Sequence, residues 1–173
     1  MKKAVVLLSG GLDSATILHD ALDKGYTPQC LIFSYGQRHK KEITQAKKIA
    51  TKAGCPYTIV TISPPWQGSS LLDRSLSLPT RKKIGAHTIP STYVPARNII
   101  FLSFAASFAE AIGARVVFIG ANAIDYSGYP DCRPEFFHAF EEGIRCGMKA
   151  GVEGRRIKVI TPLTKMSKAQ IIR

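Results

Sequence analysis

The sequence is poor in acidic side chains, in cysteine and in long apolar runs. Twelve Asp and Glu oppose 24 Lys and Arg in 173 residues, which gives a formal charge of +12. The spacing of Cys30, Cys55, Cys132 and Cys146 contains no Cys-x-x-Cys pair, so it predicts neither a zinc module nor a disulfide framework. The apolar run 4–8 is too short to cross a membrane, and no signal-peptide cleavage site follows it. We therefore expect a cytoplasmic protein with reduced thiols and no membrane partner.

Two common nucleotide-binding strings are also missing. The sequence contains neither the Gly-x-x-x-x-Gly-Lys-Ser/Thr string of the Walker loop nor the Gly-x-Gly-x-x-Gly fingerprint, which argues against γ-phosphoryl transfer and against NAD binding. The positive charge is uneven, because residues 145–173 hold eight Lys or Arg and one acid. This bias suits an anionic partner, but without a supporting motif a solvated basic face is the better interpretation. Direct binding of nucleic acid is therefore not expected.

Short apolar segments alternate with amphipathic ones along the chain. We expect strands at 5–8, 30–33, 57–62, 116–119 and 158–160, and helices from 14, over 39–53, 97–112 and 135–149, and from about 167. Apolar strands that alternate with helices predict an α/β fold, a doubly wound, mainly parallel five-stranded sheet with helices on both faces. Residues 63–92 are rich in Pro and Gly and predict a functional or disordered loop. No domain boundary is visible, so 1–173 is expected to form one domain.

The first predicted strand runs directly into Ser9-Gly10-Gly11-Leu12-Asp13-Ser14, after which a helix begins. The free N–H groups at the start of a helix form a binding site for an anion. Two glycines permit a positive φ and let an anion approach the main chain, while the serine hydroxyls add donors. Asp13 can hold a cation against bound phosphates. A strand-to-helix turn that merely uses glycine is the alternative, and the six-residue string in this context disfavours it.

This string resembles the PP-loop of the ATP pyrophosphatase superfamily, whose members have the adenine nucleotide alpha-hydrolase-like fold. The resemblance implies that the loop holds the β,γ-pyrophosphate of ATP and that AMP is transferred to a substrate. A grip on the β- and γ-phosphates makes pyrophosphate the leaving group and exposes the α-phosphorus to an attacking oxygen.

Three further segments fall at predicted strand ends or helix starts. They are Phe33-Ser34-Tyr35-Gly36-Gln37-Arg38-His39, Tyr93-Val94-Pro95-Ala96-Arg97-Asn98 and Ser127-Gly128-Tyr129-Pro130-Asp131-Cys132-Arg133-Pro134-Glu135-Phe136. Each segment also has a purely structural interpretation. The first could be a turn before a helix, the second a helix cap with a surface charge, and the third a β-turn. A guanidinium among helix N–H groups, as at Arg97, favours a phosphate ligand. The ring, carboxylate, thiol and guanidinium of 129–133 suit a planar, hydrogen-bonding heterocycle.

Together with the PP-loop, these segments resemble the 7-cyano-7-deazaguanine synthase family of the queuosine and archaeosine base pathway. The resemblance covers nearly the whole chain. It implies a ligase that converts 7-carboxy-7-deazaguanine, ammonia and ATP into the nitrile, through an adenylated carboxylate and an amide, with release of AMP. It also implies ATP and Mg²⁺ as cofactors and a homodimer. The alternatives are a PP-loop enzyme that modifies tRNA, of the lysidine or thiouridine synthetase type, and a catalytically inactive nucleotide-binding relative.

The resemblance also implies which residues form the site. Those expected to bind ATP are Leu8, Ser9, Gly10, Gly11, Leu12, Asp13, Ser14, Ala15, Thr16, Ile17, Leu18, Phe33, Tyr35, Gln37, Arg97 and Asn98. Those expected to bind the deazapurine are Ser127, Gly128, Tyr129, Asp131, Cys132 and Arg133. The catalytic set is Asp13, Arg97, Asp131 and Arg133, and Asp13 is also the metal ligand. From charge alone, Asp131 is expected to pair with the guanidine-like edge of the base and Arg133 to attract its carboxylate.

The sequence departs from the family pattern in one place. Family members carry a cysteine cluster that binds structural Zn²⁺ some tens of residues after a Pro-Leu-x-x-x-x-Lys segment, here Pro162-Leu163-Thr164-Lys165-Met166-Ser167-Lys168. None of the four cysteines corresponds to those ligands. Residues 1–173 are therefore expected to be a PP-loop domain that lacks the zinc-binding segment, with the Zn²⁺ ligands beyond Arg173.

Overall fold

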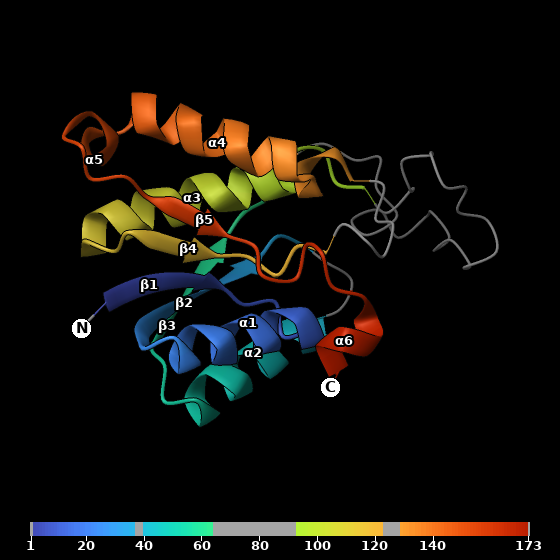
Figure 1. The fold of residues 1–173 in the computed structure, drawn as a ribbon. Helices are drawn as coiled ribbons and strands as arrows, with labels where there is room; N and C mark the ends of the chain where they lie inside the picture. The colour runs from blue at the N-terminus through green and yellow to red at the C-terminus, as the bar shows by residue number, and fades with distance from the viewer. Residues whose placement is uncertain (1, 37–39, 64–92, 123–128, 173) are drawn as a thin grey trace.

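The computed structural model describes residues 2–36, 40–63, 93–122 and 129–172 (Figure 1). Its strands are β1 (Lys2–Leu7), β2 (Tyr26–Ser34), β3 (Tyr57–Thr61), β4 (Val116–Phe118) and β5 (Lys158–Ile160). They form one sheet in the order β3-β2-β1-β4-β5, and every neighbouring pair is parallel. The predicted doubly wound sheet is thus confirmed. The chain winds outward in opposite directions from β1, so β1 and β4 flank the topological switch point at which such sheets bind ligands.

Helices cover both faces of the sheet, as the sequence predicts. Figure 1 shows α1 (Leu12–Asp23), α2 (Lys40–Lys52) and α6 (Lys168–Ile172) on one side, and α3 (Arg97–Ile112), α4 (Pro134–Gly147) and α5 (Lys149–Val152) on the other. The side chains of β1 alternate between the two resulting cores: Val6 packs in the cluster that contains Ile17 of α1, and Val5 in the cluster that contains Leu102 of α3. Because both faces of β1 are buried from Ala4 to Leu7, this part of the strand is a continuous apolar run.

One predicted helix is divided. The pattern over 135–149 predicts a single helix, but α4 ends at Gly147, Met148 is extended (φ −116°, ψ 148°), and α5 begins at Lys149. The chain turns back so tightly that a Cβ at Gly151 would overlap the backbone of Arg145. The two residues lie on either side of the break at Met148. The helical periodicity of the sequence could not reveal this break.

Strand β2 begins at Tyr26, four residues before the predicted start at Cys30. Its register with β1 pairs Lys2 with Tyr26 and Leu7 with Leu31, so the full length of β1 is matched. The predicted long loop lies almost entirely in residues 64–92, outside the described residues. Within the described ranges, none of the helices combines the length and apolar character needed to cross a membrane.

We predict that the thiols differ sharply in reactivity. Burial, with a smaller effect from the neighbouring Cys55, raises the pKa of Cys30 to about 12, whereas Cys146 is exposed. Since the thiolate is the nucleophile, a chromogenic disulfide reagent at pH 8 should modify Cys146 rapidly and Cys30 only after unfolding. Cys146→Ser should remove the fast phase of the reaction, and Cys30→Ser should leave it unchanged. A fast phase that depends on Cys30 would contradict the buried position of β2.

Candidate active site

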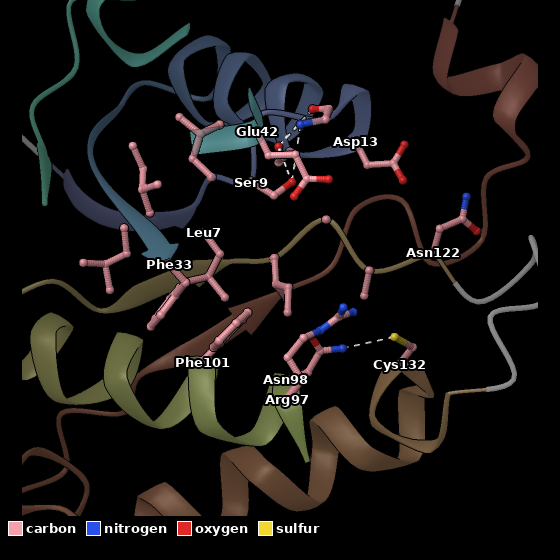
Figure 2. Close-up of a pocket in the computed structure, with 18 of the residues that line it drawn as sticks. Leu7, Ser9, Asp13, Phe33, Glu42, Arg97, Asn98, Phe101, Asn122 and Cys132 are labelled. Atoms are coloured by element: carbon pink, nitrogen blue, oxygen red, sulfur yellow. Dashed lines mark hydrogen bonds between the residues drawn. The ribbon is translucent and has the colours of Figure 1, made fainter. Parts of the chain in front are cut away.

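A cavity of about 560 Å³ opens at the carboxyl ends of β1, β2 and β4, between the start of α1 and the start of α3 (Figure 2). The PP-loop and α1 form one wall. The first turn of α3 and the 129–132 segment contribute to the wall opposite. This is the edge of the sheet at which the sequence predicts the site, and residues far apart in the chain meet there.

Hydrogen bonds within the loop 9–14 hold its shape. The hydroxyl of Ser9 donates to that of Ser14 (3.1 Å), the N–H of Gly10 donates to Ser14 Oγ (3.2 Å), and the Ser14 hydroxyl donates to the carbonyl of Gly11 (2.9 Å). Gly11 is the N-cap of α1 and has no side chain that could cap the first turn of that helix. The loop is therefore preorganised, and the first N–H groups of α1 are available to an anion.

Two glycines let other segments pack against this loop. Gly10 has a φ of +87°, and a Cβ there would overlap the carbonyl oxygen of Glu42 and lie 2.8 Å from the amide nitrogen of Ala46. A Cβ at Gly120 would lie 3.1 Å from the carbonyl carbon of Asp13. The sequence explains Gly10 by its positive φ and the approach of an anion; the structure adds that the backbone of α2 is its close neighbour.

Asp13 has two carboxylate oxygens in different situations. Oδ2 lies 2.5 Å from Nζ of Lys168, and Oδ1 is buried without a hydrogen-bond partner. A buried carboxylate oxygen without a partner is costly, and a cation supplied by a ligand would satisfy it. No group of three His, Cys, Asp or Glu suited to a metal occurs among the described residues. Asp13 therefore fits Mg²⁺, which commonly takes one or two carboxylates together with substrate phosphates and water.

Arg97 lies across the cavity from Asp13 (Figure 2), at the first position of α3. Its guanidinium carbon is 5.8 Å from the centroid of the Tyr129 ring, within the range of a cation–π contact. Burial raises the pKa of the Tyr35 phenol, and the Arg97 guanidinium nearby partly opposes that shift. Two rings and one cation thus gather on the wall opposite the PP-loop.

Asn98 connects α3 to the Pro130–Cys132 turn, a short 3-10 helix. Its backbone N–H donates to Oδ2 of Asp131 (2.9 Å), and its side-chain amide donates to the carbonyl of Asp131 and to Sγ of Cys132 (both 3.2 Å). Asn98 and Asp131 are only 7% and 5% exposed. Two of the segments singled out in the sequence are therefore fastened to each other.

An apolar surface lies beside the end of β2. The rings of Phe33 and Phe101 are stacked, with centroids 4.0 Å apart and planes inclined by 9°. Both rings, together with Leu7 and Leu31, line the cavity. A flat apolar surface with a few polar groups at its rim suits a purine base.

The structure brings most of the predicted site together. The predicted residues that line the cavity are Leu8, Ser9, Gly11, Leu12, Asp13, Ser14, Phe33, Tyr35, Arg97, Asn98, Tyr129 and Cys132. The predicted residues absent from its lining are Gly10, Ala15, Thr16, Ile17, Leu18, Asp131 and Arg133. Ile17 and Leu18 are fully buried in the core, and Arg133 is exposed. Gln37, Ser127 and Gly128 lie outside the described residues, and the roles given to Asp131 and Arg133 stay predictions.

Sequence reasoning missed several residues of the site. The unpredicted lining residues with polar or close backbone contacts are Glu42, Gly120, Asn122 and Lys168. The position of Gly120 and Asn122 directly after a buried strand was a usable signal, because carboxyl ends of parallel strands meet at one edge. Lys168 belongs to the basic stretch 145–173 and to the Pro-Leu-x-x-x-x-Lys segment, which served only as a landmark.

The parallel sheet and its Ser-Gly-Gly-Leu-Asp-Ser loop define the class as a PP-loop nucleotide-binding protein. Solved structures agree on the fold. A predicted tRNA methyltransferase subunit from Methanocaldococcus jannaschii is 17% identical (TM-score 0.58), over 99% of this chain and 73% of its own. A 4-thiouridine synthetase, solved with RNA and bound ATP, is 21% identical (TM-score 0.56), over 99% of this chain and 39% of its own.

The family follows from the sequence comparisons. The model of the queuosine biosynthesis protein QueC matches residues 3–173. Relatives named 7-cyano-7-deazaguanine synthase are 53% identical in Leptospira interrogans, over 98% of this chain and 70% of the relative, and 53% identical in Acetivibrio thermocellus, over 100% and 77%. The chain belongs to the QueC family, which confirms the predicted place in queuosine biosynthesis.

We predict that the two loop glycines differ in their effect on stability. Gly10→Ala places a Cβ against the backbone of α2 at a positive φ, and should lower the free energy of unfolding by about 2–4 kcal/mol. Gly11→Ala is the matched control, because the φ of Gly11 is −82° and its nearest contact would be Ser9 Oγ at 3.6 Å. Urea denaturation should show a change below about 1 kcal/mol for that variant. Equal destabilisation by the two changes would contradict the close packing of α2 on Gly10.

Proposed function

We propose that this chain is a 7-cyano-7-deazaguanine synthase, which converts 7-carboxy-7-deazaguanine and ammonia to the nitrile at the expense of ATP. The observation that carries the proposal is the cavity itself. The cavity is lined by the glycine-capped start of α1, by Asp13 with its buried oxygen that has no hydrogen-bond partner among the described residues, and by Arg97. The relatives that bear this enzyme name match along nearly the whole chain, which supports the same conclusion.

In this proposal ATP lies across the cavity. The first turn of α1 and the loop 9–14 bind the β,γ-pyrophosphate, because the N–H groups at the start of α1 are held in place by the preorganised loop. Arg97 faces this wall and neutralises phosphate charge. The adenine lies beside the end of β2, near Phe33 and Tyr35, where the cavity offers apolar and aromatic surface. The deazapurine then lies toward Tyr129 and Cys132.

Two activations by the same chemistry give the nitrile. An oxygen of the substrate carboxylate attacks the α-phosphorus, pyrophosphate leaves, and ammonia displaces AMP to give the amide with loss of a proton. The amide oxygen then attacks the α-phosphorus of a second ATP, and pyrophosphate leaves again. Cleavage of the C–O bond releases AMP with that oxygen, and loss of the two nitrogen protons leaves C≡N. The chain's part is to hold and orient the phosphates and the planar base.

Asp13 is the residue that would hold Mg²⁺, through the oxygen that has no partner. Bound there, the ion would neutralise charge on the phosphates and on the departing pyrophosphate. Lys168 now pairs with the other oxygen of Asp13, and both side chains are partly exposed. We infer that the ammonium of Lys168 turns toward phosphate oxygens when nucleotide fills the cavity, because it already lies at the edge of that wall.

Four further properties belong to the proposal. These are a homodimer, a cytoplasmic location, small molecules rather than nucleic acid as direct partners, and a structural Zn²⁺. None of the four cysteines corresponds to the family's zinc cluster, so no residue of this chain is proposed as a zinc ligand.

We predict that Asp13→Ala abolishes adenylation. Loss of a group that stabilises developing charge in a phosphate site costs about 10²–10³-fold in kcat, and exchange of labelled pyrophosphate into ATP should fall at least that far. The fold should persist, since the carboxylate faces the cavity rather than the core. Asp20→Ala is the control, because Asp20 pairs with Lys24 on the exposed side of the same helix. Normal exchange in Asp13→Ala would refute the assignment of the loop.

The product distinguishes the candidate functions. With 7-carboxy-7-deazaguanine, ammonia and ATP, we expect release of AMP and pyrophosphate, and mass spectrometry should detect the nitrile, which differs from the amide by one water. The amide alone would limit the enzyme to the first activation. No turnover of the free base, together with steeply salt-dependent binding of tRNA, would favour the tRNA-modifying alternative. Binding of ATP without any turnover would favour an inactive relative.

A further inference from the structure

The start of α3 is capped by a residue from a distant segment. Ala96 occupies the N-cap position with a φ of 55°, and its side chain makes no hydrogen bond to the first turn. The acceptor for this turn is Asp131, which lies 33 residues after Asn98. Its Oδ2 accepts the N–H of Asn98 at 2.9 Å. A carboxylate at a helix N-terminus is favourable, because it meets both the unpaired N–H groups and the positive end of the dipole.

The connection is reinforced and buried. The Asn98 side chain donates to the Asp131 carbonyl and to Cys132 Sγ, so three hydrogen bonds join the first turn of α3 to the Pro130–Cys132 turn. Asn98 and Asp131 are both more than nine-tenths buried. A charge-assisted hydrogen bond in such surroundings is strong and directional. The two segments are therefore held in one relative position.

The residues next to this connection are the ones that face the cavity. Arg97 immediately precedes Asn98, and Tyr129 lies two residues before Asp131. Both line the cavity, and the guanidinium lies 5.8 Å from the ring centroid. Asp131 itself is absent from the cavity lining. The Asp131 carboxylate thus holds the first turn of α3 from the side that faces away from the cavity.

We propose that Asp131 is a positioning residue, which caps α3 and thereby orients Arg97 and Tyr129, and that it does not pair with the deazapurine. This role replaces the one expected from charge alone. It rests on the proposed function of Arg97 at the phosphates of ATP. The N–H of Asn98 at the start of α3 is already bound by a carboxylate of the protein. The pyrophosphate is therefore assigned to the start of α1.

A double-mutant cycle between Arg97 and Asp131 tests the proposal. Arg97→Ala should raise KM for ATP or lower kcat, and Asp131→Ala should change the same parameters in the same direction, by about 10- to 100-fold in kcat/KM. The double variant should lose clearly less than the product of the two single effects, because Asp131 acts in part through Arg97. Effects that multiply would overturn the proposal, since a merely structural loss acts independently of Arg97.

Asp131→Asn separates positioning from substrate contact. The amide oxygen still accepts the Asn98 N–H, so this variant should stay within about threefold of the unchanged protein. If Asp131 paired with the guanidine-like edge of the deazapurine, Asp131→Asn would instead raise KM for the deazapurine at least about tenfold and leave KM for ATP unchanged. That result would overturn the proposal. Glu135→Gln, an exposed carboxylate in the first turn of α4, is the control.

The remaining outcomes are also decisive. If Asp131→Ala does not fold, Asp131→Asn still decides the question, because it keeps an oxygen that can accept the Asn98 N–H. A rise in KM for the deazapurine in that variant, with KM for ATP unchanged, would refute the positioning role. If Arg97→Ala is fully active, the proposed function of Arg97 is wrong and positioning through it falls as well. An impaired Arg97→Ala beside an unaffected Asp131→Ala refutes positioning alone.

Discussion

The close approach of three backbones around the PP-loop is the constraint on which the rest of the site depends. The backbone of α2 lies against Gly10, and the segment after β4 lies against Asp13 at Gly120. A Cβ would overlap backbone atoms at Gly10 and would be tightly packed against Asp13 at Gly120. The PP-loop reaches this position because it follows β1, the central strand of the sheet, whose residues pack into the cores on both faces. The anion site therefore results from packing as much as from the residues that would touch a phosphate.

Two helix starts face the same cavity, and the structure treats them differently. The N-cap of α1 is a glycine, which offers no side chain to the first turn, whereas the N–H of Asn98 in α3 already bonds to a buried carboxylate. An incoming anion would have to displace Asp131 to use the second site, at the cost of a buried charge without a partner. The cavity thus offers helix N–H groups at α1 and a guanidinium at α3. This division favours a nucleotide whose phosphates extend from one wall to the other.

The sequence predicted the elements whose signals are local. The buried strands appear as apolar runs, the helix over 97–112 matches α3 to the residue, and the PP-loop is a contiguous string. Contacts between distant segments were not predictable in this way. The Asp13–Lys168 ion pair joins residues 155 positions apart. The break at Met148 is local, but the helical periodicity of the sequence does not show it. Charge at Asp131 was visible, but its partner was a backbone N–H, which leaves no trace in the sequence.

Asp13 and Asp131 show how burial decides what a carboxylate can do. Asp13 is paired with a lysine whose side chain is 48% exposed, and exposed ion pairs contribute at most about 1 kcal/mol. Such a pair can open at little cost when a cation and phosphates arrive. Asp131 is 5% exposed and tied to the first turn of α3, and breaking that connection would leave a buried charge unsatisfied. The exchangeable carboxylate therefore suits binding of a ligand, and the fixed one suits positioning of the groups that bind it.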